Sequence, residues 1–260
     1  MIHVAGSGYP AGTIIVAAAI QPRYYEFSLS LDGLYAPEGT KLDIERSCDI
    51  TLNFNNGVRK MVVEWCWFLG DDHSFSPTLL MRLLQHNVDV VVPITPCKVP
   101  PFYPCVLHGG PDGWNEDMPI YKWHELSGEG LLALPKGDFI GQAGMLVKKH
   151  VLDRIGDPWF KCGQLDPGRL QEDMMFCREI QQLGYTVWVD QDVIFDHHFT
   201  MGVTARRHEG RWVPALKSPN GQVMVLPDAK PKFNLNVSGD KPGRWGDLPV
   251  EKDYLKSVAS

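Results

Sequence analysis

The sequence predicts an α/β fold in which helices flank a mostly parallel central sheet. Short, continuous apolar segments begin at residues 13, 65 and 88, and each is bounded by turn residues, as expected of strands buried on both faces. Segments with helical apolar spacing separate these strands. This alternation is typical of βαβ units, and 260 residues with 44% hydrophobic content can fill a large core.

Composition narrows the class of protein. A net charge of −6 argues against a nucleic-acid-binding surface over the whole molecule. The six cysteines include no Cys-x-x-Cys pair, so buried free thiols in a reducing cytoplasm are expected, with an oxidised pair as the minor alternative. The first ten residues lack the basic start and apolar core of a signal peptide, and no apolar segment is long enough to span a bilayer. We therefore expect a soluble, cytoplasmic protein.

The first strand is expected at residues 13–20, followed by a loop that faces a ligand. Gln21 and Pro22 end the strand, because proline restricts the residue before it. Ala19 is small enough to let a flat ring approach the backbone, although alanines in a strand also pack under helices. A helix follows at residues 47–61, where Asn53 is a poor helix former that either faces a ligand or lies near the end of the helix.

The stretch at residues 65–77 organises the rest of the chain. An apolar strand ends there in Asp71, Asp72 and His73. In open α/β sheets, ligands bind at the carboxyl ends of the strands, and oxygen and nitrogen ligands suit a cation such as Mn²⁺ or Mg²⁺. The alternative is a solvated acidic turn.

Residues 93–135 form a long insert rich in proline, glycine and aromatic residues. A long irregular insert in a compact domain is usually functional. Trp114 and Trp123 have the flat faces that stack on a sugar, although such side chains also cover an insert's own small core.

The segment at residues 139–147 returns to the core. Gly141 and Gly144 permit close approach of the backbone to a ligand, and turn geometry explains them equally well. Trp159 lies in the loop before the next helix.

That next helix, at residues 172–183, begins with Glu172 and Asp173. The carboxylate of Asp173 is expected to lean toward the inner side, although acidic residues are also favoured in any first helical turn.

The last core strands are expected at residues 186–189 and 193–195, and they lead into His197 and His198. Adjacent residues of a strand point to opposite faces, so at most one of these histidines reaches a given metal. Beyond them, a hairpin is expected around residues 220–221, followed by an extended tail. The domain organisation expected is residues 1–204 and residues 205–260.

These segments, in this order, resemble the inverting, family-2-like glycosyltransferases of the GT-A fold over about residues 13–200. The resemblance rests on the opening strand, the Asn-bearing helix, the segment from Phe68 to His73, the Gly141 segment, Trp159 with its neighbours, Glu172-Asp173 and His197. It implies a GT-A, Rossmann-like sheet and a nucleotide-sugar donor.

The resemblance also implies a metal site. Asp72 resembles the last aspartate of the family's Asp-x-Asp motif, whereas Gly70 stands where its first aspartate is usual. Alternatively, Asp71 and His73 match an Asp-x-His variant. His197, or less well His198, resembles the histidine that completes the metal shell.

The remaining roles follow from the same resemblance. Asp173 resembles the catalytic base, and Glu172 would orient the acceptor. The donor would contact Ala19, Gln21, Pro22, Asn53, Asp71, Gly141 and Gly144, and the acceptor would contact Trp114, Trp123 and Trp159.

The activity implied is transfer of a hexose, with inversion, from a uridine diphosphate sugar to a hydroxyl of a glycan, a protein, modified DNA or a small molecule. The alternatives are a nucleotidyltransferase and a non-catalytic carbohydrate-binding module on the same fold.

Overall fold

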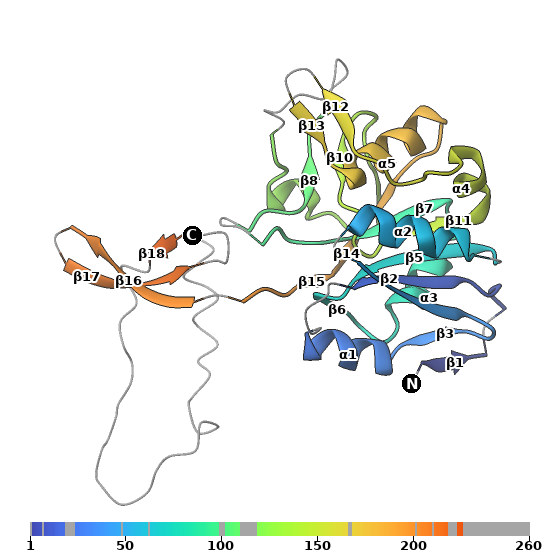
Figure 1. Cartoon of the computed structure of the whole chain (residues 1–260), viewed down its shortest axis with the longest axis horizontal. Helices are drawn as coiled ribbons and strands as arrows, with labels where there is room; N and C mark the ends of the chain where they lie inside the picture. Colours follow the sequence, from blue (N-terminus) through green and yellow to red (C-terminus); the bar gives the residue numbers. More distant parts are fainter. Residues whose placement is uncertain are drawn as a thin grey trace, which may run out of the picture.

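The computed structural model describes residues 2–6, 8–18, 24–47, 49–61, 63–98, 102–109, 119–165, 168–200, 202–209, 211–217 and 223–225. The fold of these residues is α/β, built on a seven-stranded sheet (Figure 1). The strands follow one another across this sheet in the order β4 (Lys41–Arg46), β2 (Thr13–Ala18), β5 (Trp65–Gly70), β11 (Leu146–Lys148), β7 (Val90–Ile94), β14 (Trp188–Ile194) and β9 (Leu131–Ala133).

The sheet is mixed, so the expectation of a mostly parallel sheet is confirmed only in part. Strands β4, β2 and β5 pair in parallel, and so do β7 and β14. Strand β11 runs antiparallel to both β5 and β7, and β9 runs antiparallel to β14. The direction of β11 follows from its entry point. The backbone N–H of Gly144 donates to the carbonyl of Phe68 near the end of β5, so the chain enters at that edge and runs back.

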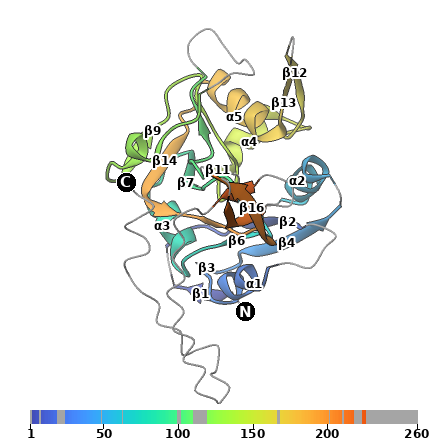
Figure 2. The same ribbon diagram turned by 90° about the vertical axis from the view of Figure 1, so that its left-hand side faces the viewer.

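Two apolar layers cover the two faces of the sheet. Ile14 and Trp67 point into a layer with α1 (Tyr25–Asp32) and α3 (Leu79–Gln85). Their neighbours Ile15 and Phe68 point into a layer with the three helices α2 (Ile50–Arg59), α4 (Lys149–Ile155) and α5 (Glu172–Gln182). This alternation is the period of a strand buried on both faces. In Figure 2, α4 and α5 lie above β2, and α1 lies below it.

Four side chains form the centre of the second layer. Phe54, Phe68, Phe160 and Phe176 stack or meet edge to face, with ring centroids 4.2 to 5.8 Å apart. The amide of Asn55 closes this cluster, because it donates to the carbonyl of Phe160 at 2.7 Å and accepts from the N–H of Phe160 at 2.9 Å. An asparagine in the middle of α2 therefore holds the loop before α5 in place.

Shorter pairings complete the described chain. Strand β1 (His3–Ala5) pairs with β3 (Tyr35–Pro37), β8 (Val106–Leu107) with β10 (Phe139–Ile140), β12 (Gly163–Leu165) with β13 (Gly168–Leu170), and β6 (His73–Ser74) with β15 (Asp196–His197). A 3₁₀ helix, η1 (Trp123–Leu126), lies within the insert.

The C-terminal part of the described chain is a separate three-stranded sheet of β16 (Gly202–His208), β17 (Arg211–Lys217) and β18 (Val223–Val225), which projects beyond β15 (Figure 1). The predicted turn at residues 220–221 and the predicted tail lie outside the described residues. Among the helices that the structure describes, none has both the length and the apolar surface needed to cross a bilayer.

Candidate active site

The candidate metal ligands meet where the chain leaves the centre of the sheet. Strand β5 ends at Gly70, a turn follows, and β6 then pairs with β15 in antiparallel register. His73 lies directly opposite His197 in this pairing. Directly opposed residues of an antiparallel pair place their side chains on the same face, so the register alone brings the two imidazoles together.

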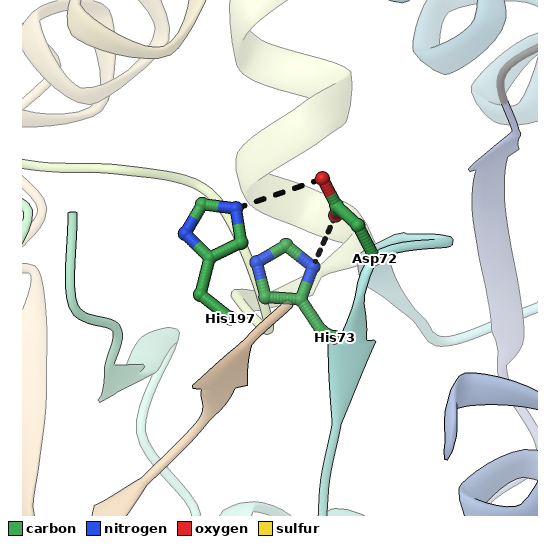
Figure 3. Close-up of side chains that lie close together, drawn as sticks. All are labelled: Asp72, His73 and His197. Carbon is green, nitrogen blue, oxygen red and sulfur yellow. Dashed lines mark ion pairs between the residues drawn. The ribbon is translucent and has the colours of Figure 1, made fainter. Parts of the chain in front are cut away.

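Asp72, His73 and His197 form a compact cluster, which we call the Asp-His-His cluster (Figure 3). Asp72 Oδ1 lies 2.9 Å from His73 Nδ1, and Asp72 Oδ2 lies 3.6 Å from His197 Nε2. The two imidazole rings stack with centroids 4.3 Å apart. One ligand atom from each residue lies within 4.8 Å of the others, which is close enough for all three to bind one cation.

Two features of the imidazoles fit a metal site. His197 Nδ1 lies 2.9 Å from the carbonyl oxygen of Pro96, which can only accept, so Nδ1 donates there. This leaves Nε2, on the side of Asp72, as the nitrogen that would bind a metal. His73 Nε2 is buried and has no hydrogen-bond partner among the described residues. Buried polar atoms without a partner are rare, and ligand sites are among the places where they occur.

Gly70 is explained by the same cluster. A Cβ atom at this position would lie 2.8 Å from Asp72 Oδ1 and 3.0 Å from His73 Nδ1. Any larger residue would therefore push the two side chains away from their present positions. The glycine that departs from the Asp-x-Asp pattern is what leaves room for Asp72 and His73 to meet.

The surroundings of the cluster shift the pKa values of Asp72 and His73. Burial alone would raise the pKa of the Asp72 carboxyl, but hydrogen bonds with His197, His73 and Lys98 together hold this pKa far below its usual range. The Lys98 ammonium forms an ion pair with Asp72 Oδ2. Burial lowers the pKa of His73, against the opposing influence of Asp72, and so favours the neutral imidazole that a metal requires.

The ligand set fits Mn²⁺ better than Mg²⁺. Imidazole nitrogens suit first-row transition metals, whereas Mg²⁺ prefers an all-oxygen shell. Two imidazoles and one carboxylate therefore suit a first-row transition metal ion better than Mg²⁺, and the choice of Mn²⁺ stays a prediction.

Asp173 is the second chemical feature of the site. It lies in the first turn of α5, where its Oδ1 accepts a 2.7 Å hydrogen bond from the N–H of Met174. Its Oδ2 is 3.6 Å from the point where a Cβ of Gly141 would lie. Burial, and then the charge of Glu172, raise the pKa of the Asp173 carboxyl to about 6. A carboxylate with this pKa can accept a proton near neutral pH.

Lys98 and Cys105, both from the insert, interact with these two features. Lys98 pairs with Asp72, and its charge also reaches the Cys105 thiol. The charge of Asp173 acts on the same thiol, and Cys105 Cβ lies 3.6 Å from the position of a Gly141 Cβ. The insert thus places Lys98 beside the Asp-His-His cluster, and Cys105 within electrostatic reach of both Lys98 and Asp173.

The structure separates residues that the sequence left as alternatives. The backbone N–H of His198 donates to the carbonyl of Asp72, but its ring contacts Ser74 Oγ and stacks on Tyr24. His197 is therefore the histidine that faces Asp72.

The two aspartates are separated as well. Asp71 is buried and lies outside the Asp-His-His cluster. The observed cluster therefore combines Asp72 of the Asp-x-Asp pattern with His73 of the Asp-x-His pattern.

Other predicted residues have local partners. Asn53 is buried, with its amide 3.4 Å from the carbonyl of Ser47. Gly144 has φ +77°, and an added Cβ would lie 2.7 Å from Pro93 Cγ, which matches the turn explanation.

Two of the predicted acceptor tryptophans also have partners. Trp159 Nε1 donates to the carbonyl of Leu152, and Trp123 Nε1, in a residue that is 39% exposed, donates to the carbonyl of Phe102. Their roles toward donor or acceptor remain predictions.

Ala19, Gln21, Pro22 and Trp114 lie outside the described residues. Lys98 is the residue of the site that sequence reasoning missed. It lies in the irregular insert, where no spacing or strand end marks it.

Comparisons with known proteins identify no family for this chain. No family profile matches it, and no curated protein matches it in sequence. A solved structure described as the crystal structure of A197 from STIV is 13% identical, covers 85% of this chain and 98% of its own, and has a TM-score of 0.40. A likeness of this size establishes neither the family nor the activity.

Proposed function

We propose that the protein is a metal-dependent glycosyltransferase of the GT-A type, which transfers a hexose from a uridine diphosphate sugar to a hydroxyl acceptor with inversion. The observation that carries the proposal is the Asp-His-His cluster at the carboxyl end of β5. A second buried carboxyl, that of Asp173 in the first turn of α5, has its pKa raised to about 6. The sequence resemblance supports it, because the same residues match the metal and base positions of that family.

The residues divide the chemistry between them. Asp72, His73 and His197 would hold the cation, which, when bound, offsets the negative charge on the departing diphosphate. Asp173 removes the proton from the acceptor hydroxyl as that oxygen attacks the anomeric carbon. Inversion requires this base on the face opposite the leaving group, and a raised pKa makes the Asp173 carboxylate a stronger base than an ordinary aspartate while leaving it mostly ionised at neutral pH.

A donor panel tests the proposal. The protein is incubated with Mn²⁺ and a set of nucleotide sugars, and binding is followed by calorimetry and hydrolysis by release of the nucleoside diphosphate. We expect one uridine diphosphate hexose to bind only when Mn²⁺ is present and to be hydrolysed slowly, with water as the acceptor. Asp72→Ala should lose both properties, whereas Asp153→Ala, which changes an exposed carboxylate, should keep them.

The outcomes separate the alternatives. Pyrophosphate release from a nucleoside triphosphate would replace the proposal with a nucleotidyltransferase. Tight donor binding without hydrolysis, and without transfer to any acceptor, would favour a non-catalytic module. No binding of any nucleotide sugar would refute the proposed function.

A further inference from the structure

Two cysteines of the insert face each other across a short backbone pairing. The segments meet at an antiparallel bridge between Pro96 and Pro104. The N–H of Cys97 donates to the carbonyl of Tyr103 at 2.8 Å, and the N–H of Cys105 donates to that of Thr95 at 2.7 Å. These bonds fix the two backbones on either side of the thiols.

The thiols themselves are in contact. Cys97 Sγ lies 3.2 Å from Cys105 Sγ, and both residues are partly exposed. A disulfide bond joins sulfur atoms about 2.05 Å apart, so closing this pair requires a movement of roughly 1 Å. Of the other described cysteines, Cys66 and Cys177 are fully buried, and Cys162 is exposed.

We propose that Cys97 and Cys105 form a reversible modification site, a dithiol that hydroperoxides oxidise to an intramolecular disulfide. The sulfur of Cys97 attacks one oxygen of hydrogen peroxide, the O–O bond breaks, and a sulfenic acid and water are formed. The sulfur of Cys105 then attacks the sulfenic sulfur and displaces its oxygen as a second water. Two thiols and one peroxide thus give one disulfide and two waters, with both electrons taken from the sulfur pair.

The order of attack follows from the environment of each thiol. The hydrogen bond with Cys105 lowers the pKa of Cys97, which therefore forms the thiolate more readily. The same hydrogen bond, and then burial, raise the pKa of Cys105. Cys97 is accordingly the attacking sulfur, and Cys105 is the sulfur that resolves the sulfenic acid.

The proposal does not depend on glycosyl transfer, and thiol mapping on the full chain tests it. The reduced protein is treated with one equivalent of hydrogen peroxide, its remaining thiols are blocked with N-ethylmaleimide, and its peptides are analysed by mass spectrometry. We expect two free thiols per chain to be lost and a linked peptide pair carrying Cys97 and Cys105. Dithiothreitol should restore both thiols.

Variants identify the two roles. Cys105→Ser should leave Cys97 as a sulfenic acid that dimedone traps, Cys97→Ser should leave Cys105 reduced, and Cys162→Ser should behave as the parent protein. Thiol mapping of the parent protein tests the proposal even if a variant fails to fold. Full alkylation of Cys97 and Cys105 after peroxide, under conditions that oxidise Cys162, would overturn the proposal.

Discussion

Lys98 occupies the position of a competing cation at the Asp-His-His cluster. Its ammonium pairs with the same Asp72 oxygen that faces His197. An incoming metal ion has to displace this ammonium, because two positive charges cannot share one partly buried carboxylate oxygen without repulsion.

We therefore predict that Lys98→Met binds Mn²⁺ more tightly than the parent protein, by about tenfold, which corresponds to about 1.4 kcal/mol. Calorimetric titration of Mn²⁺ provides the measurement. Lys149→Met, which removes an exposed lysine paired with Asp153, should leave the affinity unchanged and serves as the control. Weaker binding in Lys98→Met would show that the lysine supports the site instead of competing for it.

Asp173 gives a prediction in which activity and stability move in opposite directions. Its folded pKa of about 6 lies above the ordinary aspartate value of 3.8, so the folded state binds the proton more tightly than the unfolded chain does. Stability contributed by this group therefore falls as the pH rises from about 4 to about 6 and remains lost above that range.

The variant Asp173→Asn should consequently have a higher Tm than the parent protein at pH 8 and the same Tm at pH 4. If the base assignment holds, it should also lose transfer by 10²-fold or more, while the parent's rate falls as the pH drops through about 6. Thermal melts at the two pH values and a pH–rate profile are the measurements. Retained transfer in Asp173→Asn would refute its role as the base.

Among the elements, α3 and β14 are joined by a charged clamp away from the Asp-His-His cluster. Arg82 of α3 bonds both oxygens of the fully buried Asp190, at 2.6 and 2.9 Å, and His86 adds a contact of 2.8 Å. Burial would raise the pKa of Asp190, but the bonds from Arg82 and His86 lower it. Its contribution to stability is therefore present at neutral pH and lost as the pH falls below the usual range of an aspartate.

Removing Arg82 leaves a buried carboxylate without its main partner. Arg82→Met should destabilise the fold by about 3 kcal/mol, the low end for a broken buried pair, because Arg82 itself is partly exposed. The matched control is Arg59→Met, which breaks the exposed, two-bonded pair with Asp157 and should cost far less than Arg82→Met. Urea unfolding at pH 7 measures both, and equal losses would contradict the difference in burial.

Elements with strong apolar periodicity are the ones that the sequence predicted. Strands β2 and β5 and helices α2, α4 and α5 lie within a few residues of their expected positions. Helix α1 was not predicted, because its buried residues are only Phe27 and Leu31, too few to form a stripe. The direction of β11 could not be predicted either, since it depends on the hydrogen bond between Gly144 and Phe68 across the sheet.

For the molecule as a whole, a metal at the Asp-His-His cluster should stabilise the folded state by mass action. At a Mn²⁺ concentration of about 100 times Kd, the expected gain is about 2.7 kcal/mol. For a chain of this size, that gain corresponds to a rise in Tm of roughly 5–10 °C.

Scanning calorimetry with and without Mn²⁺ checks this prediction. Asp72→Ala should abolish the shift, whereas Asp153→Ala should preserve it. An equal shift in all three proteins would place the ion elsewhere.

The site itself could be predicted residue by residue but not as an arrangement. Strand ends and the resemblance pointed to Asp72, His73, His197 and Asp173 separately. Which aspartate and which histidine meet is decided by the register of β6 and β15, whose residues lie far apart in the sequence. The roles of Gly70, which leaves space for Asp72 and His73, and of Lys98, which pairs with Asp72, can be recognised only once this arrangement is known.

This pairing also dictates when the site can exist during synthesis. A ribosome makes β6 early and β15 only after most of the sheet has been translated. A nascent chain that presents Asp72 and His73 has no His197 to set against them. The cation site is therefore completed only once synthesis has passed β15, and fragments stalled before that point cannot form it.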